Sequence, residues 1–149
     1  MSASATIHAS AVRVGDDGVL IRGASGSGKS ALVLQLVFRH PAATLIADDR
    51  VILGTENGRL VATAPAALAG RLEVRGQGIV TRPHVSPAAI GLAVDLLPAA
   101  DCPRMPEDGD RFVEICGIRL PRLMLPIGCI DGAERVQVAL AEAAGPAGS

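Results

Sequence analysis

One stretch of eight residues constrains the fold of this chain more than any other feature of its sequence. It matches the pattern G-x-x-x-x-G-K-[ST] at every fixed position, and it reads Gly23-Ala24-Ser25-Gly26-Ser27-Gly28-Lys29-Ser30. A loop of this kind encloses phosphate groups only when it joins a β-strand to the N-terminus of an α-helix. The segment 19–22, with three apolar residues, predicts that strand, and the segment 30–39 predicts that helix. The motif therefore predicts an α/β fold that binds a nucleoside triphosphate through residues 23–30.

The chain contains a single lysine, Lys29, and it lies inside this loop. An ammonium group is compact enough to fit between phosphates, whereas the planar guanidinium of arginine is broader. We therefore expect Lys29 to bridge the β- and γ-phosphates and Ser30 to offer its hydroxyl to Mg²⁺. The glycines allow the backbone N–H groups to turn inward, toward the phosphates.

The size and composition of the chain limit its organisation and its partners. A length of 149 residues, of which 49% are hydrophobic, predicts one domain over residues 1–149, with residues 145–149 as a frayed tail. The formal net charge of −1 and the isoelectric point near 6.3 argue against a nucleic-acid-binding surface, which needs a basic patch. Only two aromatic residues are present, so base stacking is not expected either.

The cysteines and the apolar runs indicate a cellular compartment. Cys102, Cys116 and Cys129 have no C-x-x-C spacing, and we expect them to be free thiols in a reducing cytoplasm. The N-terminus does not resemble a signal peptide, and no apolar run approaches the roughly 20 residues that span a bilayer. We therefore expect a soluble cytoplasmic protein without membrane contact.

The remainder of the chain predicts many short strands and few helices. Asn57-Gly58 between two apolar runs is a strong signal for a β-hairpin, with strands at 50–54 and 60–63. Further strands are predicted at 44–47, 72–74, 79–81, 90–96, 113–120 and 123–127, and a closing helix at 131–144. Strands and helices do not alternate along this chain, so we predict a mixed rather than a parallel sheet.

Two adjacent carboxylates, Asp48 and Asp49, follow the predicted strand 44–47. Side chains alternate across a strand, so the two should point in different directions. One could then approach Mg²⁺ while the other faces the attacking hydroxyl group. The alternative is an ordinary solvated strand end, and the nearby phosphate loop favours the functional interpretation.

Three blocks of sequence in a fixed order resemble a known family. They are Ile7-His8 with the phosphate loop, the run Leu45-Ile46-Ala47-Asp48-Asp49-Arg50-Val51, and the segment Leu72-Glu73-Val74-Arg75-Gly76-Gln77-Gly78-Ile79-Val80. Together they resemble the catalytic domain of the HPr kinase/phosphorylase family, in a short form. The resemblance implies a nucleotide-binding core like that of phosphoenolpyruvate carboxykinase, ATP and Mg²⁺ as cofactors, and a hexameric assembly. It also implies phosphorylation of a serine on HPr, a small phosphocarrier of the sugar phosphotransferase system.

The resemblance further implies roles for individual residues. Lys29 becomes a phosphate clamp, Ser30 and Glu73 become the Mg²⁺ ligands, and Asp49 becomes the proton acceptor with Asp48 as its partner. A mere surface carboxylate remains the alternative for Glu73.

Two more positions carry roles implied by the resemblance. His8 lies near the site, although a plain core or surface histidine is the alternative for it. Arg104 matches, more loosely, an arginine that contacts the transferred phosphoryl group.

Two features depart from the family pattern and keep other functions open. Members carry a basic stretch associated with phosphate removal by phosphorolysis, and this chain has Gly128-Cys129-Ile130-Asp131 in that place. Members also have a longer helical tail after the closing helix, and we expect no such tail after residue 144 of this sequence. The alternatives to a serine kinase are an ATP-binding regulatory module and a small-molecule kinase.

Overall fold

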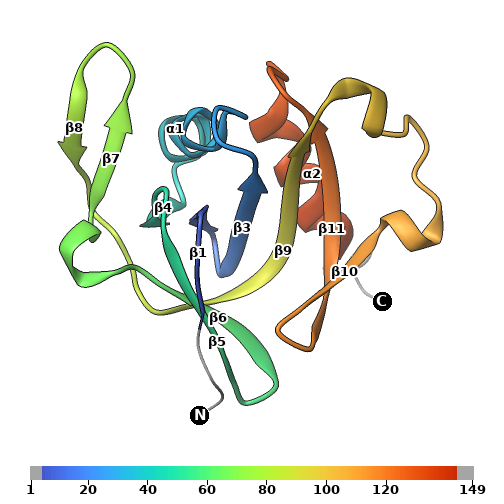
Figure 1. Ribbon diagram of the computed structural model, residues 1–149, viewed down its shortest axis with the longest axis horizontal. Coiled ribbons are helices and arrows are strands. Elements are labelled where there is room, and N and C mark those ends of the chain that lie inside the picture. The colour runs from blue at the N-terminus through green and yellow to red at the C-terminus, as the bar shows by residue number, and fades with distance from the viewer. Residues whose placement is uncertain (1–4, 144–149) are drawn as a thin grey trace.

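The computed structural model describes residues 5–143, in which two α-helices pack on a large mixed sheet (Figure 1). The sheet contains β1 (Ala5–Ile7), β2 (Ala9–Val14), β3 (Asp17–Gly23), β4 (Ala43–Ala47), β5 (Val51–Glu56), β6 (Arg59–Thr63), β9 (Ala88–Leu97), β10 (Phe112–Ile115) and β11 (Ile118–Pro126). The helices are α1 (Lys29–Arg39) and α2 (Gly132–Ala143). A separate hairpin of β7 (Arg71–Val74) and β8 (Gly78–Thr81) stands beside α1.

The strand order brings several strand ends to one edge of the sheet. β9 runs parallel to β3 on one side and to β11 on the other. β2 pairs antiparallel with both β3 and β4, so β4 runs parallel to β3 with β2 between them. The carboxyl ends of β3, β4, β9 and β11 and the beginning of β2 therefore share one edge. The predicted mixed α/β architecture is confirmed.

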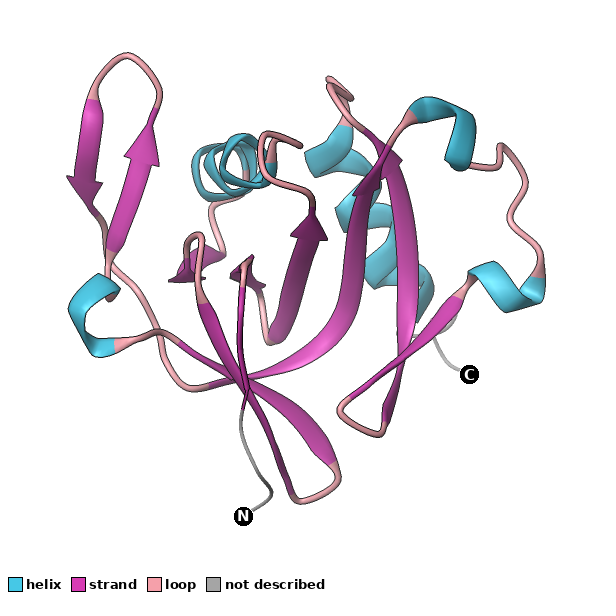
Figure 2. Ribbon diagram, viewed as in Figure 1, coloured by secondary structure: helices cyan, strands magenta, loops and turns pink. Residues whose placement is uncertain are grey.

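Apolar side chains cover both faces of the sheet. On one face, residues of α1 and α2 pack against β3, β9 and β11 in a core that includes Ile21, Leu36, Val94 and Val136. Figure 2 shows both helices against this part of the sheet. A second core on the other face includes residues of β5, β6 and β10. None of the helices within residues 5–143 combines the length and apolar character needed to cross a bilayer.

β4 contains a β-bulge directly before the acidic pair. The register between β2 and β4 shifts between Ala11 and Val12, which leaves Ile46 as an extra residue in β4. Consequently Ile46 and Ala47, although adjacent, both belong to the core on the face away from the helices. Bulges re-aim the side chains that follow them. Asp48 is thereby turned toward the helical face and the phosphate loop.

Most predicted elements are confirmed, and one strand is wrong. The helix after the phosphate loop is α1, and Asn57 (φ 52°) with Gly58 (φ 75°) forms the predicted tight turn between β5 and β6. The strand predicted at 113–120 is interrupted: Cys116 (φ 51°) and Gly117 (φ 78°) form a second tight turn, which joins β10 to β11. β2 was not predicted as a full strand. The predicted tail at 145–149 lies outside the described residues.

Candidate functional site

The phosphate loop joins the end of β3 to the start of α1, as its motif predicts. Gly26 (φ 80°) and Gly28 (φ 95°) adopt the left-handed backbone conformation that other residues rarely tolerate. A Cβ atom on Gly23 would lie 2.3 Å from the Oγ atom of Ser27 and 3.1 Å from the Cβ atom of Leu96, so a side chain there would displace Ser27 and press against β9. The loop is therefore held in a curved shape whose exposed residues surround the N-terminus of α1.

Lys29 folds back across this loop. Its side chain is 8% exposed, and Nζ donates hydrogen bonds to the carbonyl oxygens of Gly23 at 2.8 Å and Ala24 at 3.2 Å. An ammonium group has three hydrogens to donate, and two are used here. The third remains available for an anion at the N-terminus of α1, where the helix dipole also favours negative charge.

Asp48 joins three segments of the chain at the shared sheet edge. Its Oδ1 atom accepts hydrogen bonds from the hydroxyls of Ser10 and Ser30, each at 2.9 Å. Its Oδ2 atom accepts the backbone N–H of Glu73 at 3.3 Å. The carboxylate is 7% exposed, so these donors stabilise a nearly buried charge. The second residue of β2, the start of α1 and the β7 strand are thus fixed around one carboxylate.

Asp49 differs from Asp48 in its exposure and in its backbone, and both residues lie beyond the end of β4. The Asp49 side chain is exposed, and its backbone has φ 68°, which is unusual for a residue other than glycine. The backbone N–H of Asp49 donates to the Oγ atom of Ser10 at 3.0 Å. Ser10 therefore holds both aspartates, donating to one and accepting from the other.

The remaining predicted residues lie at different distances from this cluster. His8 is exposed at the bend between β1 and β2, two residues before Ser10. Glu73 is exposed on β7, and its backbone reaches Asp48. Arg104 is exposed in the segment between β9 and β10, and no hydrogen bond or ion pair joins it to another described residue. The structure thus brings Ser30, Asp48 and the Glu73 backbone together and leaves Arg104 outside their contacts.

The residues around Ser30 suit a magnesium ion in their chemistry. Mg²⁺ takes oxygen ligands and usually combines one or two protein groups with substrate phosphates and water. Because the Ser30 hydroxyl donates its hydrogen to Asp48, its lone pairs stay free for a metal. Within residues 5–143, no three His, Cys, Asp or Glu side chains form a cluster that could hold a metal. A metal here would therefore depend on phosphate oxygens for part of its coordination.

Sequence reasoning missed Ser10 and a cluster of two arginines around Asp95. Asp95 is 6% exposed and accepts hydrogen bonds from Arg22 Nε at 2.8 Å, Arg22 Nη2 at 2.9 Å and Arg122 Nε at 2.6 Å. Arg22 directly precedes the phosphate loop, so the cluster anchors the end of β3 to β9 and β11. The one available signal was Asp95, a carboxylate inside the otherwise apolar strand β9.

Substitution of Asp95 by asparagine should lower the free energy of unfolding by about 2 kcal/mol. Breaking a fully buried ion pair costs about 3–5 kcal/mol, and the arginine side chains here are 31% and 24% exposed, so water compensates part of the loss. Urea unfolding measures the difference. Asp101→Asn, an exposed position, is the control and should change stability by less than about 0.5 kcal/mol. Equal effects of the two substitutions would contradict a structural role for Asp95.

Cys129 lies in the segment between β11 and α2, and its thiol donates a hydrogen bond to Asp131 Oδ1 at 2.8 Å. Burial raises the pKa of Cys129, and the hydrogen bond to Asp131 raises it further. The same hydrogen bond lowers the pKa of Asp131, as does its bond from Arg135. Burial likewise raises the pKa of Cys102. All three cysteines are free, as predicted, and Cys129 and Cys102 remain protonated thiols at neutral pH.

Comparisons with known proteins find relatives that match most of this chain. The chain is 34% identical over 134 residues to an HPr kinase/phosphorylase of Lactobacillus acidophilus, an alignment that covers 82% of this chain and 40% of that relative. It is 40% identical over 79 residues to an HPr kinase/phosphorylase of Clostridium tetani, covering 53% of this chain and 25% of the relative. The chain thus spans less than half the length of these curated relatives.

A solved structure and a family model extend the comparison. The fold matches the Hpr(Ser) kinase/phosphatase of Coxiella burnetii with a TM-score of 0.77 and 26% identity, covering 91% of this chain and 88% of that one. The model described as "HPr Serine kinase C-terminal domain" matches residues 1–144. The phosphate loop, the acidic pair and these matches together show that the chain belongs to the HPr serine kinase C-terminal domain family.

Proposed function

We propose that this chain forms a single catalytic domain that uses ATP and Mg²⁺ to phosphorylate a serine of HPr or a related phosphocarrier. One observation carries the proposal: the hydroxyl of Ser30, directly after Lys29 of the phosphate loop, bonds to Asp48 of the acidic pair at 2.9 Å. In nucleotide-binding proteins with this loop, its serine and an aspartate at the end of another strand hold magnesium together. The relatives named as HPr kinases supply the acceptor class.

Phosphoryl transfer mainly requires positioning and the neutralisation of charge. In this proposal the loop amides of residues 23–28 and the ammonium of Lys29 bind the β- and γ-phosphates. Ser30 and Glu73 would hold magnesium, while Asp48 accepts the hydrogen of the Ser30 hydroxyl. The bound ion adds positive charge next to the phosphates.

Asp49 is the proton acceptor in the proposed reaction. The acceptor serine oxygen forms a bond to the γ-phosphorus while the bond from that phosphorus to the β,γ-bridging oxygen breaks, and ADP leaves. The serine proton passes to the exposed Asp49 carboxylate, which a protein substrate can reach. Arg104 lies on the exposed segment between β9 and β10 and is the arginine proposed to contact the transferred phosphoryl group.

Incubation with ATP labelled at the γ-phosphate and purified HPr tests the proposal. Label should appear on HPr, and an HPr variant whose target serine is replaced by alanine should receive none. Tight ATP binding without transfer would instead support a regulatory module. Transfer to small hydroxyl compounds, but not to HPr, would support a small-molecule kinase.

Phosphorolysis is a second candidate activity, in which inorganic phosphate attacks phosphoserine and releases pyrophosphate. The segment 127–131 between β11 and α2 carries no lysine or arginine, and it ends in Asp131. An anionic attacking group gains no charge stabilisation from such a segment. We therefore expect pyrophosphate release from phosphorylated HPr to be slower than the forward transfer.

The family resemblance also suggests a hexamer. Sedimentation velocity would measure the oligomeric state directly.

A further inference from the structure

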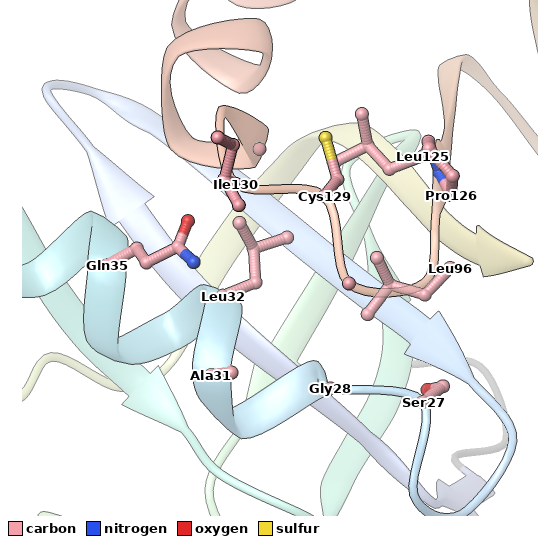
Figure 3. Close-up of a pocket in the computed structure, with 12 residues that line it drawn as sticks. Ser27, Gly28, Ala31, Leu32, Gln35, Leu96, Leu125, Pro126, Cys129 and Ile130 are labelled. Carbon is pink, nitrogen blue, oxygen red and sulfur yellow. The ribbon is translucent and has the colours of Figure 1, made fainter.

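A pocket of about 150 Å³ opens beside the phosphate loop, between α1 and the segment that leads from β11 to α2. Figure 3 shows Leu32 and Gln35 of α1 opposite Cys129 and Ile130 of that segment. At its other end, Ser27 and the N-terminal residues of α1 line the same pocket. The pocket therefore begins where the phosphate loop ends.

The walls of this pocket suit a neutral, mostly apolar ring. Leu96 and Leu125 come from the carboxyl ends of the parallel strands β9 and β11, the edge at which open α/β sheets bind ligands. None of the residues that line the pocket is charged; they are Ser27, Gly28, Ala31, Leu32, Gln35, Leu96, Leu125, Pro126, Gly128, Cys129, Ile130 and Gly132. A charged ligand would lose hydration here without gaining a partner.

Two polar atoms of the lining residues lack hydrogen-bond partners. Within the described residues, four buried side-chain nitrogen or oxygen atoms are unpaired, and two of them are Ser27 Oγ and Gln35 Oε1. A buried polar atom without a partner carries a free-energy cost that a ligand can remove. Rotation of the terminal torsion of Gln35 brings its amide oxygen or its amide nitrogen to the pocket.

We propose that this pocket binds the adenine ring of ATP and that the amide of Gln35 recognises the adenine edge. A glutamine amide can accept from N6 and donate to N7 of adenine at the same time. The neighbouring Ser27 and Gly28 connect the pocket to the phosphate loop, so one nucleotide can occupy both. This inference rests on the proposed binding of ATP by residues 23–30.

Calorimetric titrations with three ligands test the pocket. ATP carries the N6 amino group, purine riboside triphosphate lacks it, and tripolyphosphate lacks the whole nucleoside. Gln35→Met keeps the length of the side chain and removes its amide, and it should weaken ATP binding about 10-fold through the loss of these hydrogen bonds. Its affinity for tripolyphosphate should change by less than about 2-fold, since that ligand has no base, and its affinity for purine riboside triphosphate should fall less than that for ATP, since only the hydrogen bond to N7 is lost there.

Two further variants keep this test specific. Gln137→Met makes the same change on α2, outside the pocket lining, and should leave all three affinities unchanged. Ile130 is 84% exposed, so Ile130→Ala should fold normally. It should weaken ATP about 3-fold by removing an apolar contact, without an effect on tripolyphosphate.

Unchanged ATP affinity in both Gln35→Met and Ile130→Ala would overturn the pocket assignment. Equal weakening of ATP and tripolyphosphate by Gln35→Met would overturn it too, because the amide would then not act through the base. Wild-type protein that binds tripolyphosphate as tightly as ATP would contradict only the pocket. Failure of the wild type to bind either ligand would contradict both the pocket and the proposed function.

Discussion

Replacement of Lys29 by methionine should lower the rate of phosphoryl transfer about 1,000-fold while the domain stays folded. The methionine keeps the apolar stem, which is almost entirely buried, and removes only the ammonium group. That group supplies the third hydrogen-bond donor to the phosphates and positive charge in the transition state, an effect worth about 10²–10³ in rate for a single well-placed donor. Steady-state transfer of labelled phosphate to HPr measures the loss, and circular dichroism checks the fold.

Two other variants separate the role of Lys29 from that of positive charge in general. Lys29→Arg retains the charge but brings a broader group into the loop, and it should be nearly as inactive as Lys29→Met. Arg59→Met removes an exposed cation from β6 and should leave the rate unchanged. Near-normal turnover in Lys29→Met would remove this residue from the mechanism.

Replacement of Asp49 by asparagine should reduce kcat about 10²–10⁴-fold, the usual contribution of a positioned general base. Asparagine tolerates the left-handed backbone that Asp49 adopts at φ 68°, so the exchange removes the proton acceptor without adding backbone strain. The KM for ATP should stay close to its original value, because the exposed Asp49 side chain makes no hydrogen bond or ion pair with the phosphate loop. Parallel measurement of kcat and ATP binding distinguishes the two effects.

Replacement of the neighbouring Asp48 should affect ATP binding and stability, unlike replacement of Asp49. Asp48→Asn alters a nearly buried group that holds Ser10, Ser30 and the Glu73 backbone, so it should weaken the binding of ATP with magnesium and lower the stability as well. If Asp49→Asn weakened ATP binding as strongly as it reduced kcat, Asp49 would instead have a metal-binding role.

Local signals in the sequence predicted most of the secondary structure. The phosphate-loop motif and the Asn57-Gly58 turn each specify a backbone conformation by themselves, and the structure contains both. The turn at Cys116-Gly117 was missed because a cysteine with positive φ carries no comparable signal. The order of the strands was beyond local reasoning as well, since the insertion of β2 between β3 and β4 depends on pairing between segments far apart in the chain.

Site residues that belong to a sequence motif could be predicted. Residues that reach the site only through the pairing of distant strands could not. Lys29, Ser30 and Asp48 were identified from their positions, and Ser30 and Asp48 do meet. Ser10 could not be identified, because a single serine in an apolar strand is common and only the sheet order places it between the two aspartates. The same holds for Asp95, whose partners Arg22 and Arg122 come from two other strands. The roles assigned to these residues in catalysis remain predictions.

The extra residue Ile46 in β4 decides which aspartate faces inward. On a strand with a regular pleat, Asp48 would point to the opposite face and Asp49 would take its place next to Ser30. Loss of Ile46 alone would remove the bulge and leave Asp48 facing Ser30, whereas flattening of the bulge with all residues kept would exchange the positions of the two carboxylates. When roles are transferred between related proteins, the presence of this bulge therefore matters as much as the identity of either aspartate.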